Sequence, residues 1–415
     1  MLRRAVHAAA RCHGPRSTAA CAGISAPVRR FLSTEANNQG PRVTKEMLVH
    51  EGKEMLSLFV GGIAAVTALL VSGGFAIETG KAYNPPPPPG SLVELQDQDG
   101  KTLKIHYQKQ GNGPVTVLLD GGVGETSFDW EKVSEQLAQF ATVVSIDRPG
   151  LGFSTQGQEP RTATLIASEY SALLNKLNLP KNVILVGHGA GGYSMRELAW
   201  QLDQCTIGPK CNGLVLVDAL EENLRGELES VSEPVKDALA KMDSNGQLVL
   251  ALAYIGLVRL IGVVQHSQLA AKYSALALPF VEYFSPTPAH RRAALRENEA
   301  IAQTEQHFRE SAPRSRPLPA VVLSHGRTGM FTSMKFQQGV DEVAIRALET
   351  KWQEGQQRLA KTVGAVQIVV PEAGHNIQQE KPEEVVKAVR ALIEESNEPG
   401  HSAGLASLQT ATCPV

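Results

Sequence analysis

Short apolar runs recur along most of this chain and alternate with longer stretches of helical pattern. Six such runs are predicted strands, at 115–119, 142–146, 183–186, 214–217, 320–323 and 366–370. Most of them are apolar at consecutive positions, which is typical of parallel strands covered on both faces. The helical stretches between them lie near 127–140, 163–178, 190–203, 340–361 and 383–395. The pattern predicts an α/β fold with a mostly parallel sheet and helices on both faces.

Two segments depart from this alternation. Residues 92–96 and 103–108 alternate in polarity around Asp99-Gly100, which predicts an antiparallel hairpin at the start of the sheet. Residues 219–318 lie between two strands and carry a helical pattern, so we expect a helical cap over the carboxyl edge of the sheet. Within the cap, 248–264 is apolar except for Arg259, which fits cap core or a lipid-facing surface.

The N-terminal residues 1–34 contain six arginines and no Asp or Glu. Arg-, Ala- and Ser-rich segments without acids are typical of organelle transit peptides. The segment ends in Arg29-Arg30-Phe31-Leu32-Ser33-Thr34, which resembles a mitochondrial presequence processing site with cleavage before Ser33. We expect a mitochondrial targeting segment, with a plastid signal and a disordered basic arm as the alternatives.

A stretch of 23 residues, 55–77, carries no charged side chain. As a helix it would be about 34 Å long, against a hydrocarbon core of roughly 30 Å. We expect one transmembrane helix there, preceded by a linker over 35–54; the alternative is a helix buried in a globular core. The protein is then a single-pass membrane protein, and the expected transit peptide places it in the mitochondrial inner membrane.

The charges around the predicted span are unequal. Arg42, Lys45 and Lys53 precede it, whereas only Lys81 follows it closely. Positive residues favour the matrix side, so the larger C-terminal part is expected to face the intermembrane space. Five consecutive prolines in the segment 78–90 predict a stiff polyproline II spacer before the folded body.

Composition excludes several classes of protein. The chain has 40 basic and 42 acidic residues, and without the Arg-rich terminus the acids exceed the bases, so binding to nucleic acid through bulk positive charge is not expected. The five cysteines are too few for a disulfide scaffold, and no Cys/His cluster has zinc spacing. We therefore expect no metal and no cofactor.

A glycine-rich turn follows the predicted strand 183–186. It reads Gly187-His188-Gly189-Ala190-Gly191-Gly192 and enters a helix. This resembles the nucleophile elbow, G-x-S-x-G, of the α/β-hydrolase superfamily, in the strand–turn–helix context that the motif requires. The resemblance extends in order over about 91–395, through segments at 120–124, 147–154, 213–218 and 373–375. It implies a core made of 91–218 and 319–396, with the cap at 219–318 between them and a disordered tail over 397–415.

One residue breaks the family's pattern. The nucleophilic Ser is replaced by Gly189, and glycine has no atom that could form an acyl-enzyme. Glycine also relieves the strain of the elbow, which costs a residue with a side chain about 1–3 kcal/mol. Ser194, one turn into the helix, is a poor replacement because it lies away from the tip.

The resemblance assigns the remaining roles. His375 occupies the position of the general base. No carboxylate follows the strand that ends at Leu323, so Asp218 is the better candidate for the acid; the alternative is that Asp218 caps the next helix. Glu221 and Glu222 are the next candidates.

The oxyanion hole would use the backbone N–H groups of Gly122 and Ala190. Asp120 stands where many family members have His. An anion at that place is expected to disfavour an oxyanion by Coulomb repulsion.

Two functions are compatible with these residues. The first is a membrane-anchored binding or scaffold component without serine-hydrolase activity, that is, a pseudoenzyme. It would hold a small apolar ligand under the cap or belong to an inner-membrane protein complex. The second is a hydrolase acting on an ester or lipid-like substrate with His375 and Asp218 but without a Ser nucleophile. The first is favoured because Gly189 removes the nucleophile.

Cys205 and Cys211 flank a turn that contains Gly208-Pro209. Such a turn can bring the two Cβ atoms toward the roughly 3.5–4.5 Å separation of a disulfide. The alternatives are a disulfide, which the intermembrane space permits, and two reduced thiols that pack as small apolar groups.

Overall fold

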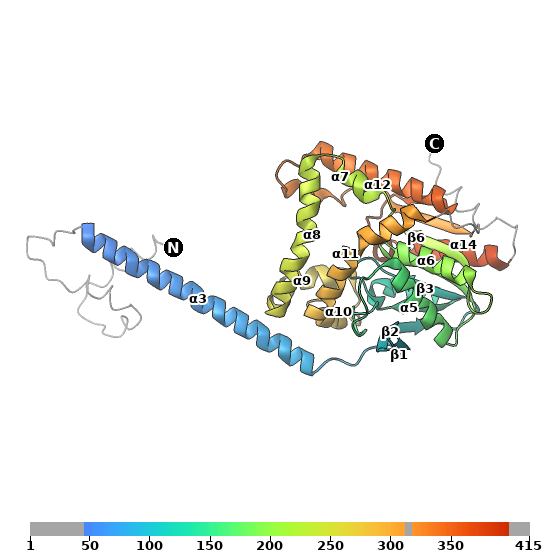
Figure 1. The fold of residues 1–415 in the computed structure, drawn as a ribbon, viewed down its shortest axis with the longest axis horizontal. Coiled ribbons are helices and arrows are strands. Elements are labelled where there is room, and N and C mark those ends of the chain that lie inside the picture. Colours follow the sequence, from blue (N-terminus) through green and yellow to red (C-terminus); the bar gives the residue numbers. More distant parts are fainter. Residues whose placement is uncertain (1–44, 312–317, 398–415) are drawn as a thin grey trace, which may run out of the picture. The chain divides into compact units, whose positions relative to one another are not determined.

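The computed structural model describes residues 45–311 and 318–397 (Figure 1). The chain divides into two compact units, Met1–Thr67 and Ala68–Val415. The predicted targeting segment 1–34, and nearly all of the predicted tail 397–415, lie outside the described residues.

A long helix, α3 (Lys45–Tyr83), contains the predicted span and extends beyond it at both ends. The flanking residues include Lys, Glu and Met, which are good helix formers, so the helix does not stop where the apolar stretch stops. Among the described residues it is the one helix long and apolar enough to cross a membrane, over Val49–Lys81. The helix is therefore a candidate membrane anchor.

Within residues 45–311 and 318–397, eight strands form one sheet in the order β1-β2-β4-β3-β5-β6-β7-β8. The antiparallel hairpin of β1 and β2 lies at one edge, β2 pairs antiparallel with β4, and every later pairing is parallel. The predicted α/β fold, with its initial hairpin, is confirmed. The bounds of the strands are Ser91–Gln96, Thr102–Gln110, Thr116–Asp120, Thr142–Ile146, Asn182–His188, Lys210–Val217, Ala320–His325 and Val366–Val370.

Alternate residues of the strands enter two separate cores. Leu118 of β3 faces α5 (Ala163–Lys176), α6 (Gly191–Gln204) and α12 (Glu342–Val363). Val117 and Leu119 face the opposite side, against α4 (Glu131–Leu137) and α14 (Pro382–Asn397). Because successive side chains of a strand point to opposite faces, a strand buried on both sides must be apolar throughout.

In the described part of the cap, up to Ser311, five helices are inserted between β6 and β7. Figure 1 shows α8, α9 and α10 gathered on one side of the sheet, while α11 runs back toward it. Apolar residues of α7, α8 and α12 form a further cluster around Trp352. The cap helices are α7 (Leu224–Glu229), α8 (Glu233–Tyr254), α9 (Leu257–Lys272), α10 (Leu278–Phe284) and α11 (Pro288–Glu310).

Local capping interactions fix both ends of α12. The Asp341 carboxylate accepts the Ala344 N–H at 2.8 Å and so caps the first turn of α12. Gly364 ends the same helix with φ of +68°, a conformation that glycine adopts without a steric penalty. The short helices are η1 (Ser127–Trp130), η2 (Thr332–Phe336) and α13 (Ile377–Glu380).

The structure does not contain the disulfide considered for Cys205 and Cys211. Cys205 is exposed just after α6, whereas Cys211 is a buried residue of β6. The Cys211 thiol lies in the core and donates to the Gly213 carbonyl at 3.5 Å. Strand pairing turns this side chain into the core, so it packs there as a small apolar group.

Candidate active site

The predicted elbow forms the tight turn between β5 and α6, and Gly189 lies at its tip with φ of +52°. A Cβ at Gly187 would lie 2.5 Å from the Gly191 carbonyl oxygen, and a Cβ at Gly191 would lie 2.5 Å from the Gly121 oxygen. These two glycines are therefore required for space. At Gly189 the nearest atom to a Cβ would be the Gly122 Cα at 3.4 Å, so there is room for a side chain and only φ favours glycine.

The structure brings His375 and Asp218 together below this tip. His375 follows β8, Asp218 follows β6, and His375 Nδ1 lies 2.7 Å from Asp218 Oδ2. The other ring nitrogen, Nε2, would be 3.9 Å from a Cβ at Gly189. His375 is thus an imidazole oriented by a carboxylate, with its second ring nitrogen near the tip of the turn.

Asp218 is fully buried and holds more than one partner. His325 Nδ1 lies 2.7 Å from Asp218 Oδ2, and the Trp352 indole N–H donates to Oδ1 at 3.0 Å. Burial alone would raise the pKa of Asp218, but the hydrogen bonds from His325 and His375 outweigh it and hold this pKa well below its ordinary value. Asp218 is therefore an ionised carboxylate shared by two imidazole rings.

His325 was missed by the sequence reasoning, which noted only that no carboxylate follows β7. Its Nε2 lies 3.2 Å from Glu349 Oε2 of α12, so each ring nitrogen faces an acid. Burial disfavours its charged form, but hydrogen bonds to Asp218 and Glu349 raise the pKa of His325 to about 9. The His325 ring is therefore protonated at neutral pH and places a positive charge next to Asp218.

The predicted oxyanion loop is occupied by a side chain of the protein itself. The Gly122 N–H donates to Glu125 Oε2 at 2.6 Å. The same oxygen lies 2.7 Å from Nδ1 of His188, the second residue of the elbow. The backbone donor that would stabilise an oxyanion therefore already binds a carboxylate.

His188 and Glu125 form an ion pair at the floor of the site. His188 Nε2 faces the His375 carbonyl oxygen at 3.1 Å, so both ring nitrogens face acceptors and the doubly protonated ring satisfies both. Burial disfavours the charged ring, but Glu125 outweighs it and raises the pKa of His188. Burial likewise opposes ionisation of Glu125, yet His188 and the Gly122 N–H lower the pKa of Glu125 to about 2.

The Asp120 carboxylate is held in a buried hydrogen-bond network. Its carboxylate accepts from Arg148 Nη1 at 2.5 Å, from the Tyr170 hydroxyl at 2.7 Å and from the Ser194 hydroxyl. The expectation that Asp120 repels an oxyanion is corrected, because Arg148 compensates its charge. Ser194 is buried in this network, where it cannot replace the nucleophile.

The remaining acids considered for His375 lie elsewhere. Glu221 pairs with Arg358 at 2.9 Å, and Glu222 pairs with Arg196 at 2.8 Å. Neither contacts His375. Of the candidates for the acid, only Asp218 is within hydrogen-bond distance of it.

A cavity of about 440 Å³ lies between the elbow and the cap. Its floor includes Gly122, Gly189, Ala190 and His375, so the groups predicted from sequence share one space. Its walls are mostly apolar side chains of the cap and of β7–α12. They include Leu220, Leu224, Leu228, Leu239, Met242, Ile301, Met330 and Trp352.

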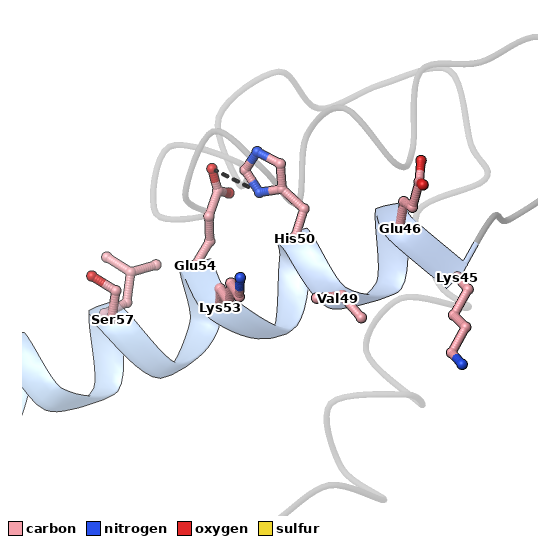
Figure 2. Close-up of a pocket in the computed structure, with 8 residues that line it drawn as sticks. Lys45, Glu46, Val49, His50, Lys53, Glu54 and Ser57 are labelled. Atoms are coloured by element: carbon pink, nitrogen blue, oxygen red, sulfur yellow. Dashed lines mark ion pairs between the residues drawn. The ribbon is translucent and has the colours of Figure 1, made fainter.

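A separate hollow follows the first turns of α3, and Figure 2 shows the side chains that line it. His50 and Glu54 approach to 3.8 Å there, with both side chains more than half exposed. Exposed pairs of this kind contribute about 0–1 kcal/mol. Among the described residues that line this hollow, the exposed His50–Glu54 pair is the one pair of base and acid, so the cavity under the cap remains the candidate site.

A sequence model of the alpha/beta hydrolase family matches residues 117–388, which is more than half of the chain. This chain therefore belongs to the alpha/beta hydrolase family. Mouse protein phosphatase methylesterase 1 is 26% identical to it over 144 residues, which are 34% of this chain and 36% of that protein. An uncharacterized protein of Mycobacterium tuberculosis is 33% identical over 113 residues, 27% of this chain and 31% of that protein.

Solved structures agree with this assignment. A thermophilic esterase from Thermogutta terrifontis matches with a TM-score of 0.52 and 20% identity, over 74% of this chain and 99% of that chain. The epoxide hydrolase CorEH matches with a TM-score of 0.51 and 17% identity, over 73% and 99%. At these identities the likeness shows the fold alone. The chain spans about a third of the length of the curated relatives described above.

Proposed function

We propose that this chain is a membrane-anchored member of the alpha/beta hydrolase family that binds a small apolar ligand beneath its cap and does not catalyse serine-type hydrolysis. One observation carries the proposal: at the elbow tipped by Gly189, the Gly122 N–H is bound to the Glu125 carboxylate at 2.6 Å. The nucleophile is thereby missing, and of the two expected oxyanion donors the Gly122 N–H is already bound.

The chemistry of acyl transfer explains why this observation is decisive. The serine mechanism needs an atom that attacks the carbonyl and donors directed at the oxygen that becomes negative. Glycine supplies no such atom. A carboxylate already on the donor leaves that N–H unavailable, so an oxyanion would have to displace Glu125 to reach it. The apolar walls of the cavity still suit binding of a ligand.

A second function rests on the pair His375 and Asp218. With Nδ1 held by Asp218 at 2.7 Å, His375 is oriented to take a proton from water through Nε2. In serine enzymes that lack the triad, substrate binding and oxyanion contacts still accelerate the reaction roughly 10³–10⁴-fold over its rate in water. An ester or lipid-like substrate would be the candidate for such slow hydrolysis.

The first function predicts that the full chain, in lipid nanodiscs, does not react with a fluorophosphonate probe. It also predicts turnover of short-chain aryl esters no faster than that of the His375→Ala variant, because no step depends on the base. Intact mass after probe treatment and hydrolysis rates measure both. Labelling of any Ser would contradict the proposal, and His375-dependent turnover without labelling would favour the second function.

We propose further that α3 anchors the protein in the mitochondrial inner membrane as a component of that membrane, either alone or in a complex. The Arg-rich residues 1–34 support the organelle, and the basic residues before the apolar stretch support a body in the intermembrane space. Protease added to mitochondria with a ruptured outer membrane should then degrade the body. Protection until the inner membrane is lysed would contradict this orientation.

A further inference from the structure

The acidic side chains that line the cavity under the cap differ in whether a basic side chain is close enough to pair with them. At the floor, Glu125 and His188 form their own ion pair at 2.7 Å. Glu221, which also lines the cavity, is paired with Arg358 at 2.9 Å. Neither acid needs a ligand to balance its charge. A ligand carboxylate at the floor would find the Gly122 N–H already bound by Glu125, so an anionic ligand gains no hydrogen bond from that donor.

Glu305 of the cap helix α11 differs from these acids. Its side chain lines the cavity and is only about 5% exposed. Among the described residues its one ion pair is with Arg309 Nη1 at 3.8 Å, which is beyond hydrogen-bond distance. The Arg309 guanidinium itself donates to the Glu222 carbonyl. A buried carboxylate without a close donor is costly unless a further group pairs with it.

A second polar group beside Glu305 lacks a partner. The Tyr193 hydroxyl is buried and has no hydrogen-bond partner among the described residues. Burial and the nearby charge of Glu305 raise the pKa of Tyr193, so the phenol stays protonated. Tyr193 lines a small hollow that shares Ala190 and Ile301 with the main cavity. Glu305, which has no close hydrogen-bond donor, thus lines a largely apolar cavity that also holds Arg225 and Glu229, and the Tyr193 hydroxyl lies in the small hollow next to it.

We infer that this cavity takes an organic amine, with its ammonium group held by Glu305 and its apolar chain along the cap. The inference rests on the proposed function and names the ligand class of the same site. An ammonium supplies three N–H donors and a positive charge, which match the acid. The hydrocarbon chain of the amine would lie in contact with the apolar side chains of Leu224, Leu228, Leu239 and Ile301.

The protonation of Glu305 gives the inference a pH signature. Burial raises the pKa of Glu305 to about 7; Arg225 and Arg309 oppose this rise, and Glu221 and Glu229 add to it. An ammonium pairs with the ionised acid, so amine affinity should increase as the pH rises from 6 to 8. Above that range the acid is fully ionised and the increase ends.

The test compares three water-soluble probes of equal chain length, hexylamine, hexan-1-ol and hexanoate. Each is titrated calorimetrically into the full chain in lipid nanodiscs, with empty nanodiscs subtracted. Hexylamine should bind at least tenfold more tightly than hexanol at pH 8, and hexanoate more weakly than both. Glu305→Gln should reduce hexylamine affinity about tenfold, leave hexanol unchanged and remove the pH dependence. Gln has the shape of the neutral acid, so this variant should fold.

Glu299→Gln is the matched control, because Glu299 lies on the same helix, pairs with Arg296 and does not line the cavity. It should bind all three probes as the natural sequence does. Equal binding of hexylamine and hexanoate, binding of none of them, or an unchanged hexylamine preference in Glu305→Gln would overturn the inference. Ester turnover would contradict the absence of hydrolysis but leave the amine preference standing, so the two failures can be distinguished.

Discussion

The variant Gly189→Ser should react with a fluorophosphonate probe, in contrast to the natural sequence. A Cβ at this position would lie 3.9 Å from His375 Nε2, so a serine hydroxyl comes within reach of an oriented base. The positive φ of +52° should reduce the free energy of unfolding by about 1–3 kcal/mol. Intact mass and thermal unfolding measure the two effects.

Matched variants separate the effect of backbone strain at position 189 from the reactivity of the new hydroxyl. Gly189→Ala carries the same backbone strain without the hydroxyl, so it should lose similar stability and remain unlabelled. Adding Glu125→Ala to Gly189→Ser frees the Gly122 N–H for an oxyanion. One such donor is worth about 10²–10³ in rate, and labelling should accelerate by about that factor. A folded Ser variant that remains unlabelled would show that His375 is not placed to act as its base.

Arg148→Met should cause a large loss of stability. Arg148 is 3% exposed and donates to Asp120 at 2.5 Å and to Glu297 at 2.7 Å, as well as to the carbonyls of Gly121 and Gly122. Removing it leaves two buried carboxylates without their cation. Breaking a buried pair in this way costs about 3–5 kcal/mol, which is a large part of the stability of a typical domain.

Arg327→Met is the surface control for that measurement. Arg327 pairs with Glu380 at 2.6 Å, but its side chain is 58% exposed. Exposed pairs contribute about 0–1 kcal/mol, so this variant should unfold almost as the natural sequence does. The free energy of unfolding of both variants can be measured by denaturant titration in nanodiscs. A loss below about 1 kcal/mol for Arg148→Met would contradict the role given to the network.

Much of the fold could be predicted because its determinants are local. Strands such as β3 are apolar at successive positions, since both faces are covered, and a turn rich in glycine marks the elbow. The same local information places Gly189 and His375 after their strands. The bounds of α3 could not be predicted from apolarity, because helix propensity continues beyond the apolar stretch.

The electrostatics of the site could not be predicted in the same way. Glu125, His188 and His325 were visible in the sequence, but their roles depend on contacts between distant segments. Glu125 meets His188 across 63 positions, and His325 meets Asp218 across 107. One signal was available: His325 lies two positions after the predicted strand 320–323, at the edge of the sheet where sites of α/β proteins lie. Asp120 was misjudged because its partner Arg148 belongs to another loop.

The contact between Arg148 and Glu297 also limits how a molecule can enter or leave. Glu297 belongs to α11, and its carboxylate binds both Arg148 and the Gly124 N–H, at 3.1 Å for the latter. Buried hydrogen bonds and an ion pair of Glu297 therefore hold α11 to the loops that contain Gly124 and Arg148. The cap should not swing open as one rigid lid. We therefore expect the cap to loosen first along α7 and α8, which pack on α12 through an apolar cluster, while α11 stays in place.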